Sequence, residues 1–259
     1  MSMTYFTTLR NQFVDSFGLT LARASFVTSL AVGSSVSGQS IAVPNASFES
    51  PTTPPGFPAF PQVDQWQKTP EVPGIPLPGG ITWDQLSGVF PNTPAGSGNH
   101  IDNLDGAQAA YILAIPGVGL YQSLSTSFEA GKSYSLSVGI LGGGGIAEGS
   151  TFELGLFYTD AGNSLAPVAA TSITYTPAAF PNATHLLDYQ VTLPAVQATD
   201  AWAGKNIGIR LLSTFGTGAG YWDLDQVRLT VVPEPTSIAL VALGFGGMLM
   251  AVRRSRSVL

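Results

Sequence analysis

The stretch Tyr134–Ile140, which reads YSLSVGI, alternates large apolar residues with small ones. Successive side chains of a strand point to opposite faces, so this period of two predicts a strand with one buried face. The pattern recurs in FELGLFY (Phe152–Tyr158), LDYQVTL (Leu187–Leu193) and IGIRL (Ile207–Leu211), and turn clusters such as GGGG (142–145) and FGTGAG (215–220) separate the runs. Many short strands joined by such turns predict an all-β fold, an antiparallel β-sandwich.

Composition supports this interpretation. The 259 residues include 30 Gly and 19 Pro, and only 10% are charged, which is unlike a protein of long exposed helices. Residues 51–80 hold nine prolines and four glycines, so they cannot form a central strand. We expect an ordered excursion over one end of the sandwich, pinned by Trp66 and Trp83, and a disordered linker is the alternative.

The charge pattern excludes several functions. Residues 41–232 carry five Lys/Arg against fourteen Asp/Glu, a net charge of −9, which argues against binding nucleic acid. The chain has no cysteine, so it has no disulfide or thiolate site. It has only two histidines, which disfavours a His-rich zinc site.

The C-terminal residues have three parts in a fixed order. Pro233-Glu234-Pro235 precedes an apolar run, predicted as a transmembrane helix over 237–252, and Arg253, Arg254 and Arg256 follow. A block of arginines after an unbroken apolar run is typical of a membrane segment with its basic end in the cytoplasm, rather than of a core helix. This order resembles a PEP-CTERM sorting signal, which implies processing by an exosortase. An ordinary C-terminal membrane anchor is the alternative.

Such a tail requires export, and the N-terminus is consistent with it. Arg10 and Arg23 precede the apolar, small-residue run ASFVTSLAVGSSV (24–36). We interpret residues 1–40 as a signal peptide, with a helix recognised by the Sec machinery and cleavage near Gly38 to Ser40. The predicted domains are therefore the signal peptide, a β-sandwich over 41–231 and the sorting tail over 232–259.

Four further segments resemble carbohydrate-binding-module-like jelly rolls with the galactose-binding-domain fold. They are VPNASFESP (Val43–Pro51) as an opening strand, DGAQAAYI (Asp105–Ile112), LYQSLSTSFEAGKSYSLSVGI (120–140) and the closing WDLDQVRLT (Trp222–Thr230). The resemblance spans about 190 residues and implies a jelly roll. Gln226 departs from the Asp or Asn that is usual in the family.

We find no pattern that predicts catalysis. His100 lies beside Asp102 and Asp105, but a turn with side chains bonded to the backbone explains that cluster better than a triad or a metal site does. The sequence therefore favours a protein that is not an enzyme. Aromatic rings could instead stack on sugars, and Trp83, Trp202 and Trp66 are the candidates, with core packing as the alternative for each.

The jelly-roll resemblance also implies a structural Ca²⁺ that links the opening and closing strands. Glu49 and Asp225 are at the matching positions, and calcium would need further oxygen ligands. Leu224 and Val227 are both apolar but three residues apart, so we predict a β-bulge at Asp225–Gln226. A metal-free arrangement, in which Asp225 caps a turn, remains equally open.

These observations together predict an exported protein of the cell surface or extracellular matrix. Its partners would be the Sec machinery, an exosortase, the membrane before processing and an extracellular polysaccharide. A structural matrix protein without a sugar site is the alternative, followed by an enzyme on the same fold.

Overall fold

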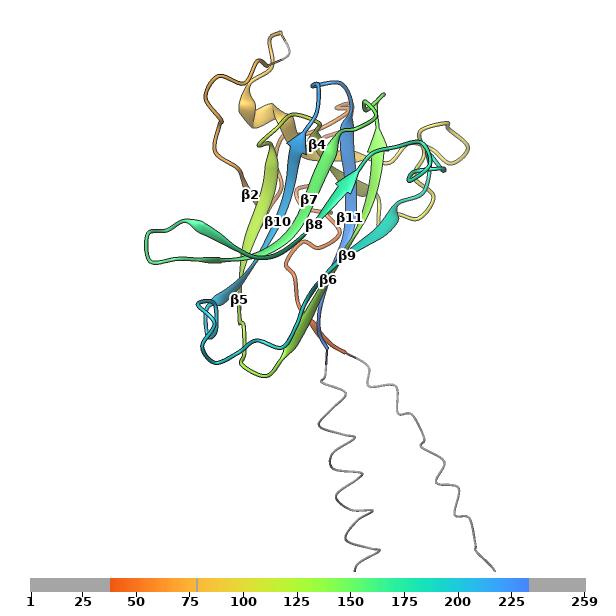
Figure 1. Ribbon diagram of the computed structural model, residues 1–259. Helices are drawn as coiled ribbons and strands as arrows, with labels where there is room; N and C mark the ends of the chain where they lie inside the picture. The colour runs from red at the N-terminus through yellow and green to blue at the C-terminus, as the bar shows by residue number, and fades with distance from the viewer. Residues whose placement is uncertain (1–37, 78, 233–259) are drawn as a thin grey trace, which may run out of the picture. The chain divides into compact units, whose positions relative to one another are not determined.

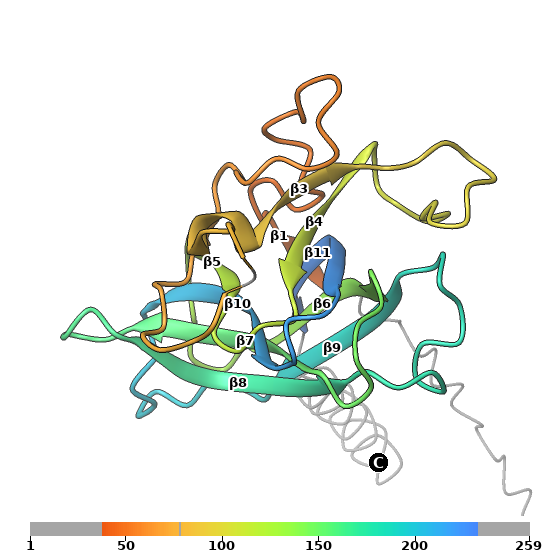
Figure 2. The ribbon, with the colours of Figure 1, turned by 90° about the horizontal axis from the view of Figure 1, so that it is seen from above.

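The computed structural model describes residues 38–77 and 79–232, which form two antiparallel sheets packed face to face (Figures 1 and 2). The first sheet has the order β3-β4-β11-β6-β9, and β1 also pairs with β11; the second has the order β2-β5-β10-β7-β8. The strands are β1 (Gln39–Ile41), β2 (Gln67–Lys68), β3 (Ser87–Pro91), β4 (Gln108–Leu113), β5 (Gly119–Ser127), β6 (Ser133–Gly143), β7 (Thr151–Thr159), β8 (Leu165–Thr174), β9 (Leu187–Leu193), β10 (Asn206–Phe215) and β11 (Tyr221–Val232). A single 3-10 turn, η1 (Trp83–Leu86), is the helical element of these residues.

The predicted antiparallel sandwich is thus confirmed, and the strands expected from period-two patterns are present as β6, β7, β9 and β10. Their apolar positions form the core between the sheets. Trp222, Tyr134 and Phe152 are among its largest fully buried side chains, and the rings of Phe152 and Trp222 lie 5.4 Å apart. Burial of such rings supplies much of the hydrophobic free energy that holds the two sheets together.

One predicted strand is wrong. Val43–Pro51 forms turns instead of an opening strand, and Asn45 and Phe48 adopt positive φ angles of 51° and 54°. The Asn45 amide donates to the backbone carbonyls of Ser50 and Asp64, which folds the segment back on itself. The true first strand is the shorter β1, which lies closer to the N-terminus.

The Pro-rich excursion is ordered, as expected. Both tryptophans fix it to its surroundings: the Trp66 indole donates to the Asn45 carbonyl at 3.1 Å, and the Trp83 indole donates to the Thr69 carbonyl at 2.8 Å. The excursion contributes only the two residues of β2, at the edge of the second sheet. An edge position is where a Pro-rich neighbourhood is tolerated, because few backbone N–H groups are needed there.

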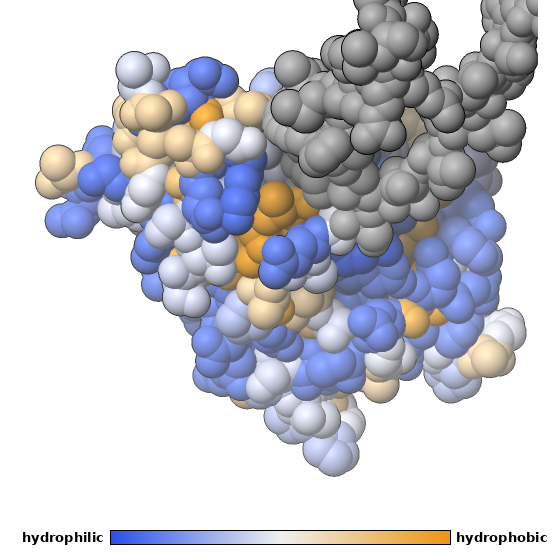
Figure 3. All heavy atoms as spheres, turned by 90° about the horizontal axis from the view of Figure 1, so that it is seen from below, coloured by the Kyte–Doolittle hydropathy of each residue, from blue (hydrophilic) through white to orange (hydrophobic). Residues whose placement is uncertain are grey.

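The ends of the described unit lie side by side, because β1 pairs with the last residues of β11 in the register Gln39↔Val231. Figure 3 shows this end of the sandwich from below, where mostly hydrophilic residues surround small hydrophobic areas. Residues 1–37 of the predicted signal peptide (1–40) lie outside the described residues, while Gln39 and Ser40 belong to β1. The motif Pro233-Glu234-Pro235, the predicted transmembrane helix 237–252 and the arginines behind it also lie outside them. Within 38–77 and 79–232, no helix has the length and apolar character needed to cross a membrane.

Candidate functional site

The candidate site lies on the outer face of the first sheet, where β11 carries two carboxyl groups. Trp222 and Leu224 of β11 point into the core and are fully buried, so the residues that alternate with them, Tyr221, Asp223 and Asp225, point outward. β11 is flanked by β4 and β6, and loops cover part of this face. Outward-facing acids on a central strand are therefore shielded from water.

Asp223 has the most unusual surroundings of the described carboxyl groups. It lies between Tyr111 of β4 and Leu141 of β6 in the sheet register, and it is only 5% exposed. Its Oδ1 atom is buried without a hydrogen-bond partner. Burial raises the pKa of Asp223 well above its usual range. Burial therefore favours the protonated form of Asp223 over the carboxylate, and its Oδ1 has no hydrogen-bond partner among the described residues.

Tyr111 does not satisfy the unpaired oxygen, because its hydroxyl donates to the Gln85 carbonyl at 3.1 Å. Burial, and secondarily the negative charge of Asp84, raises the pKa of Tyr111 to about 12. The phenol therefore stays neutral and contributes an apolar ring edge beside Asp223. The strand neighbours of Asp223 are thus the aromatic Tyr111 and the aliphatic Leu141, and neither carries a positive charge that would offset a carboxylate.

A glycine run brings a second tyrosine close to Asp223. Tyr221 pairs with Gly143 across the β11–β6 ladder, and its ring extends over Gly143 and Gly144. A Cβ atom on Gly143 would lie 2.6 Å from the Tyr221 ring and 2.7 Å from Oδ2 of Asp223. The close approach of both side chains thus requires glycine at this position. Burial, and then the charge of Asp223, raises the pKa of Tyr221.

Asp225 is held by backbone donors. Its Oδ2 accepts the Asp105 N–H at 2.7 Å, and its Oδ1 accepts the Gln226 N–H at 2.7 Å. Burial raises the pKa of Asp225 to about 7; these hydrogen bonds act to lower it, and the nearby charges of Asp105 and Glu49 add to the rise. Asp225 therefore has its charge opposed by burial and by two other acids.

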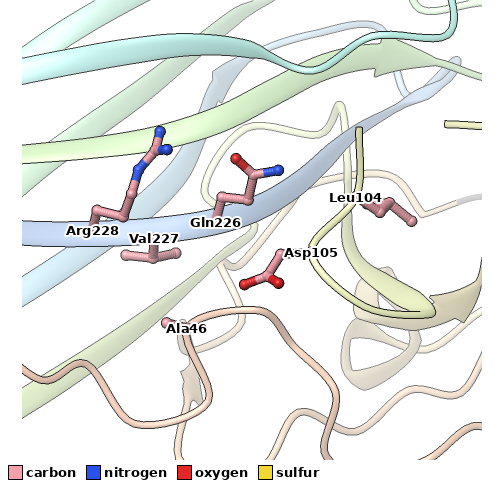
Figure 4. A pocket seen from close by; sticks show the side chains of 6 residues that line it. All are labelled: Ala46, Leu104, Asp105, Gln226, Val227 and Arg228. Carbon is pink, nitrogen blue, oxygen red and sulfur yellow. The ribbon is translucent and has the colours of Figure 1, made fainter. Parts of the chain in front are cut away.

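The bulge predicted at Asp225–Gln226 is confirmed. The β11–β6 register shifts between Asp225 and Arg228, and Gln226 has a φ of 56°. An open pocket of about 430 Å³ lies beside the bulge (Figure 4). Figure 4 shows the side chains of Gln226 and Arg228 on one side of β11 and that of Val227 on the other. The pocket is also lined by Ala46, Leu104 and Asp105.

Glu49, the other candidate calcium ligand, is held in the same way as Asp225. Its Oε1 accepts the N–H groups of Ala107 and Gln108 at 2.9 and 2.8 Å. Residues 38–77 and 79–232 contain no cluster of three or more His, Cys, Asp or Glu side chains that could hold a metal ion. A calcium ion at Glu49 and Asp225 would therefore depend on backbone carbonyls and water for the rest of its ligands.

Both histidines of the chain meet at one aspartate. Asp102 lies 3.2 Å from Nδ1 of His185 and 4.0 Å from Nε2 of His100, and it also accepts the Thr184 hydroxyl at 2.7 Å. His100 Nδ1 bonds the Thr93 carbonyl. The cluster joins two loops at the surface, since the Asp102 N–H also donates to the Thr184 carbonyl at 2.8 Å.

The three candidate sugar platforms differ in exposure. Trp66 is only 6% exposed and its ring lies 5.4 Å from that of Phe48, tilted by 38°, which agrees with the core-packing alternative for this residue. Trp83 and Trp202 are partly buried. The structure places them on η1 and in the β9–β10 loop.

Comparison with known proteins assigns the chain to a family. The sequence profile of the HpiC1-like family, described as HpiC1 cyclase, matches residues 39–230. The chain belongs to the HpiC1-like cyclase family. The prediction that the protein is not an enzyme is therefore wrong, because this is a family of cyclases and solved cyclases are among its structural neighbours.

Two solved structures illustrate the likeness. The apo form of a cyclase from Fischerella sp. is 23% identical, with a TM-score of 0.58 over 77% of this chain and 99% of that one. A cyclase from Fischerella sp. TAU in complex with 4-(1H-indol-3-yl)butan-2-one is 25% identical, with a TM-score of 0.54 over 76% of this chain and 99% of that one. A search of curated proteins found no match.

A carbohydrate-binding module in complex with β-1,4-galactotriose also matches, at 13% identity and a TM-score of 0.40 over 74% of this chain and 97% of that one. At that level the likeness carries no argument about a ligand. The jelly-roll sandwich itself rests on the sheet order and on the match to the cyclase family.

Sequence reasoning missed Asp223 and Tyr221 as site residues. A usable signal was present, because Asp223 lies between the two apolar residues Trp222 and Leu224 on an alternating strand, which places it on the outer face. What the sequence lacks is any sign that this face is covered. Tyr111 of β4 and Leu141 of β6 flank Asp223. The loop of residues 101–105, which the loop at 184–186 contacts, lies instead against Asp225 and Gln226.

Proposed function

We propose that this chain is a cyclase that uses Asp223 as a general acid. The observation that carries the proposal is the Asp223 carboxyl, which is 5% exposed, has an unpaired Oδ1 and is flanked by Tyr111, Leu141 and Tyr221. Membership of a cyclase family supports the same conclusion.

The proposed reaction is an isomerisation and needs no co-reactant. The O–H bond of the Asp223 carboxyl breaks as its proton adds to a π-bond of the substrate, which leaves a carboxylate and a carbocation. A nucleophilic carbon of the same substrate then closes the ring onto the cation. Loss of a proton from the ring-closed cation to the Asp223 carboxylate restores the acid. Exclusion of water protects the cation and keeps the acid protonated between turnovers.

We propose an aromatic substrate of the indole type. One related cyclase was solved with 4-(1H-indol-3-yl)butan-2-one and another with (3Z)-3-(1-methyl-2-pyrrolidinylidene)-3H-indole. In this chain, the rings of Tyr111 and Tyr221 beside Asp223 supply the apolar, aromatic surroundings that such a molecule prefers. An electron-rich ring system also accepts a proton from a neutral carboxylic acid more readily than an isolated alkene does.

The test is hydrogen exchange into an indole. The purified full chain is incubated in heavy water with 4-(1H-indol-3-yl)butan-2-one, and deuterium in the ring is followed by NMR. The wild-type chain is expected to accelerate exchange, and Asp223→Asn to lose the acceleration. Asp160→Asn is the matched control, since Asp160 is a partly exposed turn residue. Equal exchange by the wild type and Asp223→Asn would rule out the acid role.

An infrared measurement tests the protonated state without any substrate. The wild-type spectrum near neutral pH should contain the C=O stretch of a buried carboxylic acid, and this band should be missing in Asp223→Asn. Asp225→Asn is recorded alongside, because Asp225 also has a raised pKa. A spectrum of Asp223→Asn that keeps the whole band would contradict the assignment.

We further propose that the chain acts outside the cytoplasm. The order of Pro233-Glu234-Pro235, an apolar run and three arginines supports export, Sec dependence and exosortase processing. Binding of an extracellular polysaccharide at Trp83 or Trp202 is a second part of this proposal, supported by their partial exposure. A glycan array with wild type, Trp83→Ala and Trp202→Ala tests it, and signals equal in all three would reject those positions.

A structural Ca²⁺ bound by Glu49 and Asp225 also remains a proposal. It is supported by the contacts of both carboxylates with one segment, since Asp225 accepts the Asp105 N–H and Glu49 accepts the N–H groups of Ala107 and Gln108. The ion would offset the repulsion among Glu49, Asp105 and Asp225 and tie the 43–51 turn to β11.

A further inference from the structure

A flat aromatic surface lies directly beside the Asp223 carboxyl. The Tyr221 ring extends along the backbone of Gly143 and Gly144 instead of packing into the core, while the adjacent Trp222 points inward. A side chain at Gly144, which has a φ of 60°, would overlap the ring atoms of Tyr221. The absence of side chains at the two glycines therefore allows the ring to lie where it does.

The Tyr221 hydroxyl is not needed to hold the ring. Within residues 38–77 and 79–232 it forms no hydrogen bond. The hydroxyl of Tyr111, on the other side of Asp223, instead donates to the Gln85 carbonyl. The Tyr221 residue is also partly exposed, unlike Tyr111. A partly exposed ring with an unused hydroxyl is available to a ligand in a way that a structural tyrosine is not.

The Asp223 carboxyl and the Tyr221 ring both lie over Gly143, where a side chain would otherwise be. A Cβ atom placed there would meet both Oδ2 of Asp223, at 2.7 Å, and the Tyr221 ring, at 2.6 Å. Gly143 has no positive φ angle, so backbone conformation does not explain the glycine, and close approach does. Oδ2 of Asp223 and the Tyr221 ring therefore lie close together over Gly143.

We propose that Tyr221 is a specificity-determining residue that selects planar aromatic substrates by stacking them next to Asp223. This inference rests on the proposed function and adds the feature of the site that recognises the substrate. Stacking on the Tyr221 ring, whose position depends on Gly143 and Gly144, holds the planar part of the substrate beside Asp223. The bond to be protonated then faces Oδ2. A saturated ring of similar size has no π-face and loses the stacking contribution.

The test compares two ketones that differ in their ring. Binding of 4-(1H-indol-3-yl)butan-2-one and of 4-cyclohexylbutan-2-one to the full chain is measured by calorimetry. The wild type should prefer the indole ketone by about two- to tenfold, the range that aromatic pairs contribute beyond buried area. Tyr221→Phe should keep this preference and Tyr221→Leu should lose it.

Two glycine variants distinguish the effect of displacing the Tyr221 ring from the effect of backbone strain at a positive φ angle. Gly144→Ala displaces the ring and should reduce the preference. Gly145→Ala is the matched control, because Gly145 also has a positive φ, of 76°, but open space where a Cβ would lie. Melting curves of both variants check folding, and an effect of equal size in the two would overturn the role of the ring.

The failure of this inference can be told apart from failure of the acid role. Asp223→Asn should lose deuterium exchange and keep the preference for the indole ketone, since stacking does not need the proton. A preference that survives in Tyr221→Leu, or no binding of the indole ketone by the wild type, would overturn the proposal for Tyr221. Exchange that survives in Asp223→Asn would overturn the acid role instead.

Discussion

Asp223 and Asp225 lie on the same face of β11 but have different surroundings. Both Asp225 oxygens accept backbone N–H groups, whereas Oδ1 of Asp223 has no partner. A buried carboxylate that accepts N–H groups can stay ionised, while a buried carboxyl without donors keeps its proton. Two positions along one strand therefore separate a structural acid from a candidate catalytic one.

Asp225 gives a pH prediction. An aspartate in an unfolded chain titrates near pH 4, and the pKa of Asp225 in the fold is about 7. Because the folded pKa is the higher one, the proton stabilises the fold; this contribution is complete below about pH 4 and is lost as the pH rises through about 7. Thermal melts in EDTA should therefore give a falling Tm over this window, and Asp225→Asn should reduce the fall.

The same thermal melts, repeated in excess Ca²⁺, test the calcium proposal. A bound cation favours the ionised carboxylates, so excess Ca²⁺ should raise Tm most at about pH 8, where Asp225 is charged. Glu49→Gln should weaken this response. Melts that coincide in EDTA and in Ca²⁺ at every pH would remove the calcium proposal, and a Tm in EDTA that does not change with pH would contradict the raised pKa of Asp225.

At the scale of elements, two loops cover the outer face of the first sheet. The Asn103 side chain joins them, because its amide donates to the Leu186 carbonyl at 3.0 Å and its Oδ1 accepts the Leu186 N–H at 2.9 Å. Its own carbonyl accepts the Gln226 side chain at the bulge. The Asn103 side chain therefore adds to the contacts of Asp102 with Thr184 and His185 that join the same loops.

Asn103→Ala should remove both contacts with Leu186 and leave its backbone groups unpaired. The expected loss is about 1–3 kcal/mol in the free energy of unfolding, measured by urea denaturation. Hydrogen exchange should be faster at the Leu186 amide. Asn99→Ala is the control, since Asn99 is exposed on the same loop; equal losses in the two variants would refute the role of Asn103.

The strands themselves could be predicted where one face is buried and the other is not. Tyr134–Ile140 and Leu187–Leu193 alternate clearly, and both lie in the sheet that faces loops or solvent on its outer side. β8 was missed because Pro167 and a run of alanines hide its pattern, and Pro167 lies at a register irregularity on an edge strand.

The strand prediction for Val43–Pro51 was wrong, and the site residues were missed, for another reason. The turn at Val43–Pro51 depends on Asn45 contacts with Asp64. The burial of Asp223 depends on Tyr111 of β4 and Leu141 of β6, which lie far from β11 in sequence. Local patterns predict which face a side chain takes. They do not predict what lies over that face, and the acid role of Asp223 depends on that covering.

At the scale of the whole chain, the proposed export makes a prediction about mass. Processing near Pro233–Pro235 would remove Arg253, Arg254 and Arg256 from the mature protein. Intact-mass measurement of material from the cell surface should therefore give a species that ends before the apolar run. A mass that still includes the arginines would leave the alternative of an anchored protein.

The pairing of β1 with the end of β11 has a consequence for the order of the strands along the chain. Paired Cα atoms in an antiparallel ladder are about 5 Å apart, so a short Gly-Ser linker can join residue 232 to residue 38 without strain. New ends opened between Gly162 and Asn163, in the exposed β7–β8 turn, would give a circular permutant with every strand pair kept. This permutant should fold and show the same preference between the two ketones. Loss of folding would mean that the β1–β11 pairing must form with a free N-terminal end.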